Sequence, residues 1–79
     1  MIEDYIRRAA TELRQKSLND IQVETAKVWA GRAIAAAKLG LGHDAIEYAH
    51  EAIEHAALSG KDSLLREVRT AMDAHGVEV

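Results

Sequence analysis

The sequence contains no cysteine, proline or phenylalanine, and only five of its 79 residues are glycine. The lack of cysteine excludes disulfide bonds, thiolate metal sites and a cysteine nucleophile, and it fits a reducing compartment. The lack of proline removes the strongest local interruption of a helix. Aromatic residues make up only 4% of the chain, so large rings contribute little to any core.

The sequence also lacks a long apolar run and an excess of basic residues. Residues 33–37 form its longest apolar stretch, far short of the about 20 residues that a bilayer-spanning helix needs. The formal net charge is −3, whereas nucleic acid is normally met by a clustered basic face. The first residues are acidic, where a signal peptide would be basic and then apolar. We therefore expect a cytoplasmic protein with no membrane partner and no nucleic-acid partner.

What remains is rich in alanine, glutamate, leucine, lysine and arginine. These side chains lose little freedom in a helix, so this composition predicts a helical chain. We expect residues 1–79 to form a single domain. A domain this small buries a limited core, and its stability then depends on close helix packing or on a partner.

Apolar periodicity and glycine positions divide the chain into four expected helices, at about residues 2–16, 20–39, 43–58 and 61–75. In the first, the apolar face consists of Ile2, Ile6, Ala9, Ala10 and Leu13. Ser17 to Asp20 is expected to connect the first two helices, with either Ser17 and Asp20 or Asn19 and Gln22 as a capping pair. The apolar face of the fourth helix consists of Leu64, Leu65, Val68, Ala71 and Met72. Ser59 with Asp62 is expected to cap it, Gly76 to end it, and residues 77–79 to fray.

Residues 29–58 are the centre of the expected fold. Two alanine-rich segments flank Gly40-Leu41-Gly42, and Gly40 is a natural residue to follow a helix end. The core stripe expected of the second segment consists of Ala45, Ile46, Ala49, Ala52, Ile53 and Ala56. The sequence thus predicts an all-α fold in which an antiparallel helical hairpin lies within a small up-and-down four-helix array.

Residues 29–54 resemble one tetratricopeptide repeat (TPR). The matching residues are Trp29, Ala33, Ala35, Gly40, the run Ala45-Ile46-Glu47-Tyr48, Ala52 and Ile53. The chain departs from that family at Arg32, Ala36 and Gly42, and it has no terminal proline, no second copy and no match to the peptide-carboxylate clamp. The last three segments also resemble the microtubule-interacting-and-trafficking domain, a three-helix domain.

The TPR resemblance implies a scaffold that binds protein or peptide in a groove between helices. We therefore expect a non-enzymatic protein–protein interaction module, either a TPR-like adaptor or a subunit of a larger assembly. Its expected contact residues are Trp29, Arg32, Ala36 and Tyr48. A homodimer through an exposed apolar face is a further expectation, because the small core favours a partner.

A metal-binding helical bundle is the main alternative. His43, Glu47, His50 and Glu54 follow one another at spacings of four, three and four, which places them on one helical face. Histidine with carboxylate suits zinc or iron. The same pattern is typical of a solvated helix face with contacts between neighbouring turns. Bundle metal sites point inward, whereas this stripe lies opposite the alanine core, so we expect no metal and no other cofactor.

A nucleic-acid-associated regulator is the other alternative, and catalysis is not expected. The basic residues fall in two groups, Arg7, Arg8, Arg14 and Lys16, and Lys61, Arg66 and Arg69, with acids interspersed in both. Every serine falls at an expected helix end, where a cap is its ordinary role. No nucleophile and base stand at a spacing that would pair them.

Overall fold

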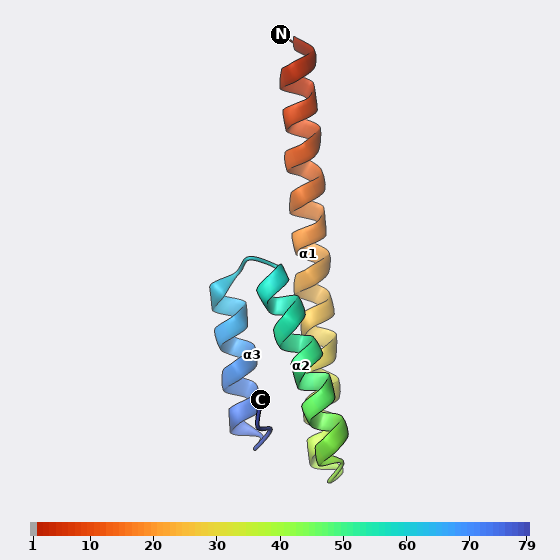
Figure 1. Ribbon diagram of the computed structural model, residues 1–79, viewed down its shortest axis with the longest axis vertical. Helices are drawn as coiled ribbons and strands as arrows, with labels where there is room; N and C mark the ends of the chain where they lie inside the picture. Colours follow the sequence, from red (N-terminus) through yellow and green to blue (C-terminus); the bar gives the residue numbers. More distant parts are fainter. Residues whose placement is uncertain (1) are drawn as a thin grey trace.

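The computed structural model describes residues 2–79 and contains three helices, with no strand among those residues. These are α1 (Ile2–Lys38), α2 (Gly42–Leu58) and α3 (Asp62–Ala74) (Figure 1). The all-α prediction is confirmed, and the prediction of four helices is wrong. None of the three helices is both long and apolar enough to cross a bilayer.

The difference lies in α1, a continuous helix of 37 residues that replaces the two helices expected at residues 2–16 and 20–39. The expected connection from Ser17 to Asp20 is helical throughout. Asn19 does not cap a helix start, since its side chain accepts a hydrogen bond from Gln15 one turn earlier. Polar residues of this kind are tolerated on a helix surface when no proline or left-handed glycine interrupts the backbone.

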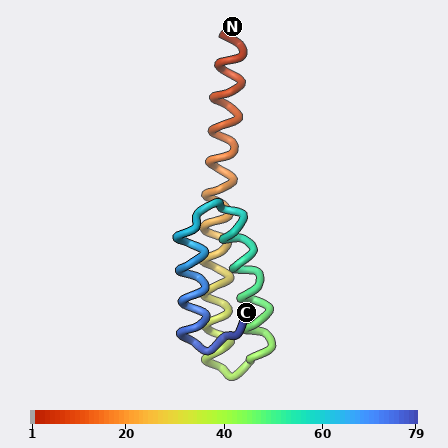
Figure 2. The backbone as a smooth tube through the Cα atoms, turned by 60° about the vertical axis from the view of Figure 1, so that its left-hand side comes forward, coloured from red at the N-terminus to blue at the C-terminus, as the bar shows by residue number. Residues whose placement is uncertain are grey.

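The two halves of α1 have different surroundings. The chain reverses after α1, α2 runs back along its C-terminal half, and α3 then runs in the direction of α1 (Figures 1 and 2). The first part of α1 extends beyond the connection between α2 and α3 (Figure 1), and we call residues 2–18, which are exposed except for the partly buried Ala9, the extension. The molecule is consequently long and thin, with principal extents of 58 × 17 × 12 Å.

The core of the three-helix body is made largely of alanine. Its buried residues on α1 are Ala26, Ala33 and Ala36, and those on α2 are Ala45, Ala49, Ala52 and Ala56. Methyl groups allow the axes of two helices to approach closely, and a close pair leaves no room for a larger side chain between them. Ile46 is therefore displaced to the rim, where it is 38% exposed, although the sequence predicts it in the core.

The third helix completes the core with larger side chains. Leu64, Val68 and Met72 are buried, as the apolar spacing predicts. The end of α3 is closed by Val77, whose N–H donates to the carbonyl of Met72 at 2.8 Å and whose side chain is only 6% exposed. The prediction that the chain frays from residue 77 onward is thus wrong for Val77, because this side chain packs under the helix end.

Glycine ends α1 as predicted, whereas serine has another role than predicted. Gly40 has φ +77°, and the N–H of Leu41 beyond it donates to the carbonyl of Ala36, which is a helix end that side chains with a Cβ rarely adopt. Ser59 was expected to cap α3 with Asp62. Its hydroxyl instead donates to the carbonyl of Ala56 at the end of α2 and accepts the N–H of Lys61.

Candidate interaction surfaces

The four residues predicted to contact a partner lie together on one side of the α1–α2 pair. The rings of Trp29 and Tyr48 pack across the two helices with centroids 5.6 Å apart. The guanidinium of Arg32 lies over the Trp29 ring at 4.9 Å, a cation–π contact. Ala36 is buried beneath them. The structure therefore brings the predicted set together, with its aromatic rings already engaged with each other.

A shallow depression of about 360 Å³ adjoins this cluster and is lined in part by Arg32, Ala36 and Tyr48. The same side of α1 carries exposed Leu18, Ile21, Val28 and Leu39, and we call these four residues the flank. A shallow apolar surface with an aromatic pair at its edge suits contact with another helix or peptide better than enclosure of a small molecule.

The histidine and glutamate stripe of α2 faces outward. His43, Glu47, His50 and Glu54 are all exposed, and only His43 and Glu47 contact each other, with Nε2 and Oε1 3.3 Å apart. Within residues 2–79, no group of three or more histidine, aspartate or glutamate side chains is placed to hold a metal ion. The stripe has the geometry of a solvated helix face.

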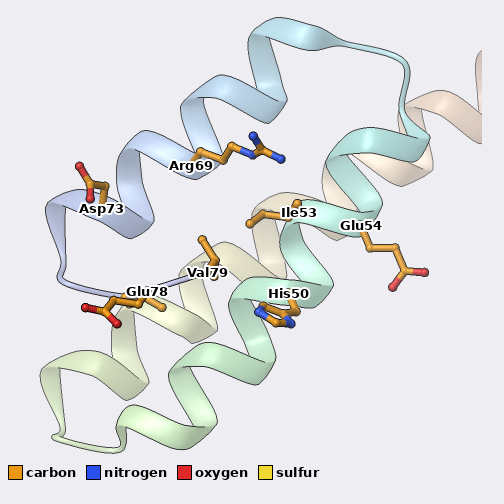
Figure 3. A pocket seen from close by; sticks show the side chains of 8 residues that line it. His50, Ile53, Glu54, Arg69, Asp73, Glu78 and Val79 are labelled. Atoms are coloured by element: carbon orange, nitrogen blue, oxygen red, sulfur yellow. The ribbon is translucent and has the colours of Figure 1, made fainter.

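An open cleft of about 740 Å³ lies between α2, α3 and the C-terminal residues (Figure 3). Arg69 projects into it from α3 across from Ile53, and Glu78 and Val79 come from the chain end, whereas Glu54 points away. The lining mixes charged and apolar side chains, and no hydrogen bond or ion pair joins the acidic and basic groups within the described residues. The cleft therefore presents no constellation of acid, base and nucleophile.

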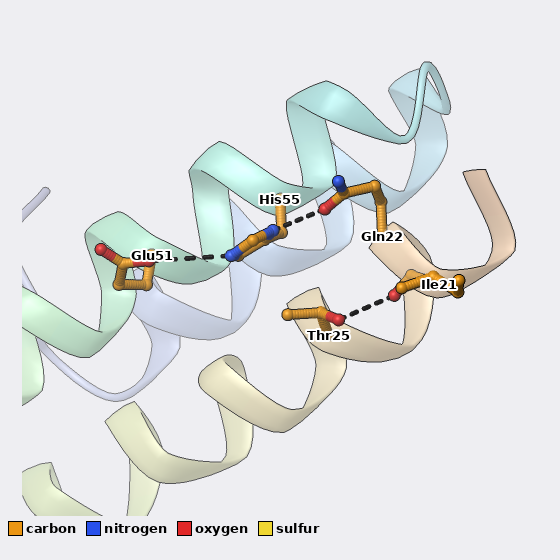
Figure 4. Close-up of polar contacts among 5 residues, drawn as sticks. All are labelled: Ile21, Gln22, Thr25, Glu51 and His55. Atoms are coloured by element: carbon orange, nitrogen blue, oxygen red, sulfur yellow. Dashed lines mark hydrogen bonds and ion pairs between the residues drawn. The ribbon is translucent and has the colours of Figure 1, made fainter. Parts of the chain in front are cut away.

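One polar contact ties α2 to the middle of α1 (Figure 4). The partly buried side chain of His55 is hydrogen-bonded through Nδ1 to Oε1 of Gln22, and its Nε2 lies 3.7 Å from Oε2 of Glu51. The sequence does not identify Gln22 as the partner of His55. No local signal connects residues so far apart in the chain.

An apolar surface without a covering element among residues 2–79 lies on the extension. Ile2, Ile6, Ala9 and Leu13 form one stripe of α1, which we call the extension stripe, and Ile6 and Leu13 are 60% and 69% exposed. The sequence predicts this stripe but places it in the core, because periodicity shows that a face is apolar and not what covers it. The first basic group, Arg7 to Lys16, lies along the same extension. Arg66 and Arg69 of the second group lie on α3, within the three-helix body.

A search against known protein families found no match, and neither the curated proteins nor the solved structures that were searched gave one. Function is therefore inferred from the geometry of the chain itself.

Proposed function

We propose that this protein is a non-enzymatic protein–protein interaction module, an adaptor or a subunit of a larger assembly, whose extension is the main contact element. The observation that supports this most directly is the exposure of the extension stripe on a helix that no other part of residues 2–79 covers. Monomeric proteins rarely leave a contiguous apolar face of this kind in water.

The physical argument concerns the stability of the extension. An isolated helix of about 15 residues is marginal in water, since most helical stability in proteins comes from packing of an apolar face. Full burial of a leucine or isoleucine side chain contributes roughly 1.5–3 kcal/mol. A partner that covers Ile2, Ile6 and Leu13 therefore stabilises both the contact and the helix that makes it.

The second contact surface in this proposal is the flank together with Trp29, Arg32, Ala36 and Tyr48. The resemblance of residues 29–54 to a TPR hairpin supports the same function, since such hairpins present helices to a protein or peptide. The shallow depression beside Tyr48 fits an extended or helical segment.

The proposal is tested by photo-crosslinking in the cell. A photoreactive amino acid replaces Leu13 on the extension stripe, and a matched variant carries it at Thr70, an exposed position of α3. We expect a discrete adduct from position 13 and none of comparable yield from position 70. The adduct mass shows whether the partner is a second copy or another protein, and both outcomes support an interaction module. Equal, weak labelling at both positions would overturn it.

A further inference from the structure

The extension stripe continues in register along the body half of α1. From Ile2 to Ile34, positions that alternate at spacings of four and three follow one side of the helix, and we call this line the seam. After Leu13 the seam passes Lys16, Asp20 and Val23, and it then reaches Ala30 and Ile34 beside α3. A seam that repeats every seven residues drifts by about 20° per heptad around a straight helix. Two such helices therefore keep their seams in contact by winding gently around each other.

We propose that the partner of the extension is a second copy of this chain, bound antiparallel so that the extension of each copy packs against α1 and α3 of the other. This inference rests on the proposed function and specifies its partner. In the register that the seam favours, two residues lie opposite each other when their numbers add to 36. Ile2 meets Ile34, Ile6 meets Ala30 and Leu13 meets Val23, and each contact occurs twice about the two-fold axis.

Charge complementarity supports this register at the centre of the overlap. Lys16 of one copy lies opposite Asp20 of the other, and the two-fold axis repeats the pair. Both side chains are exposed, and neither belongs to an ion pair formed among residues 2–79. Between the Leu13–Val23 and Ile6–Ala30 levels, Lys27 can lay its aliphatic stem over Ala9 and direct its amine to solvent.

The neighbouring registers are worse by the same criteria. A shift of one heptad in one direction places Leu13 opposite Lys16 and Ile2 opposite Lys27, which sets apolar side chains against charges. A shift in the other direction places Lys16 opposite Lys27, and like charges across an interface oppose association. The flank gives no comparable pairing. Matching Leu18 to Val28 along it sets Arg14 against Arg32, and matching Ile21 to Leu39 sets Val28 against Arg32.

The body supplies a receiving groove at the level where Ile2 and Ile6 would bind. A depression of about 320 Å³ lies between α1 and α3, and apart from Lys27 and Glu67 its lining is small or apolar. Ala30, Gly31 and Ile34 form one wall, and Leu64, Val68 and Ala71 form the other. Ala30 and Gly31 are small where Ile6 of a second copy would bind, which gives the alternation of sizes by which helices interdigitate.

Gly31 is a second, independent observation at this groove. It is exposed in the middle of α1, and a Cβ built on it would meet no atom within 4 Å. A glycine inside a helix is destabilising relative to alanine, and no contact within residues 2–79 requires it. Close approach of another helix backbone does require a small residue.

The overlap is long enough for a stable dimer. From residue 2 to residue 34 it measures about 48 Å at 1.5 Å per residue. Two helices in contact over this length, together with the α3 wall of each copy, would bury a surface area on the scale of the roughly 1,200–2,000 Å² that specific interfaces bury.

The test begins with the oligomeric state of the full chain, measured by light scattering and sedimentation from low micromolar to near-millimolar concentration. We expect a dimer that dissociates on dilution. Leu13→Asp should raise the dissociation constant by roughly a hundredfold, since the symmetry places the change in the interface twice. Thr11→Asp is the matched control, because Thr11 is also exposed on the extension but belongs to neither the seam nor the flank.

Charge exchange tests the register without removing apolar surface. Lys16→Asp or Asp20→Lys alone sets like charges against each other and should weaken the dimer roughly tenfold. The double variant Lys16→Asp with Asp20→Lys should restore it. Circular dichroism on each variant shows that the body remains helical, so a loss of dimer is not a loss of fold.

The relative orientation of the two copies is measured with spin labels. They attach only at an introduced cysteine, because the chain has no native cysteine. In the antiparallel register, labels at Leu18→Cys lie at the same height, and labels at Asp4→Cys are separated along the axis by about 42 Å. A parallel dimer would place both pairs at equal height. A monomer at every concentration, a parallel dimer, or greater loss from Thr11→Asp than from Leu13→Asp would each overturn this proposal. A monomer that still forms an adduct with another protein at position 13 would leave the interaction module standing.

Discussion

Nδ1 of His55 in α2 is hydrogen-bonded to Oε1 of Gln22 in α1. Among residues 2–79 this is the one hydrogen bond between the side chains of two different helices. This hydrogen bond lies where the end of α2 meets the middle of α1. The last residue of the extension, Leu18, precedes Gln22 by about one helical turn. The pair therefore marks the junction between the packed body and the exposed half of α1.

Removing one member of this pair should destabilise the body. Gln22→Ala leaves the partly buried imidazole of His55 without its acceptor, and we expect a loss of about 1–2 kcal/mol in the free energy of unfolding. Urea titration followed by circular dichroism measures it. Gln15→Ala is the control, because the Gln15–Asn19 bond is exposed and lies within one helix. Equal losses in the two variants would contradict a specific role for the His55 contact.

The alanine contact between α1 and α2 should not accept a larger residue. Ala49 is fully buried, so Ala49→Leu must separate the helices or distort its rotamer, at a cost of about 1–3 kcal/mol. Ala57 lies on the exposed side of the same helix, and Ala57→Leu should change stability by less than about 0.5 kcal/mol. Thermal and urea unfolding compare the two. If Ala49→Leu unfolds like the parent, the close approach of α1 and α2 is wrong.

Two glycines of the α1 region should respond to alanine with opposite signs. Gly31→Ala enters open space on a helix and should stabilise the monomer by roughly 0.5–1 kcal/mol. Gly40→Ala places a Cβ at φ +77°, which costs roughly 1–2 kcal/mol. Both are measured at low concentration, where the monomer predominates. Stabilisation by Gly40→Ala would show that α1 does not end in the left-handed turn described above.

The buried valine after α3 should contribute to stability although it lies near the chain end. Val77→Ala removes two methyl groups from a 6% exposed side chain, and we expect a loss of about 1–2 kcal/mol. Val79→Ala alters an exposed side chain and should be nearly silent. Equilibrium unfolding compares the two variants. If Val77→Ala leaves the free energy of unfolding unchanged, residues 77–79 are frayed, as the sequence predicts.

The sequence predicts features that depend on local backbone chemistry. Gly40 ends α1 because a left-handed residue is a short-range requirement, and the spacing of Leu64, Val68 and Met72 identifies the buried face of α3 for a similarly local reason. The cluster of Trp29, Arg32 and Tyr48 was also predicted as one surface, because the hairpin turn between the two helices determines which of their residues meet. The function of that surface stays a prediction.

The errors arise where the outcome depends on distant residues. Ser17, Asn19 and Asp20 are acceptable both at a helix start and on a helix surface, and nothing nearby distinguishes the two cases. Ile6 and Leu13 belong to an apolar face in either case, but their burial depends on whether another element lies over them. The partner of His55 is 33 positions away, and no periodic pattern indicates it.

The alanine stripes of α1 and α2 have a mechanical consequence. Ala45, Ala49, Ala52 and Ala56 recur at nearly equal intervals, so sliding α2 by one turn along α1 places methyl groups over methyl groups again. Such a contact resists separation of the two helices well, but it resists sliding of one helix along the other poorly. The position of α2 along α1 then depends on other contacts, among them the glycine reversal after α1, the Trp29–Tyr48 ring pair and the hydrogen bond between His55 and Gln22. Loss of the His55–Gln22 hydrogen bond would remove one of the few contacts that resist sliding of α2 along α1.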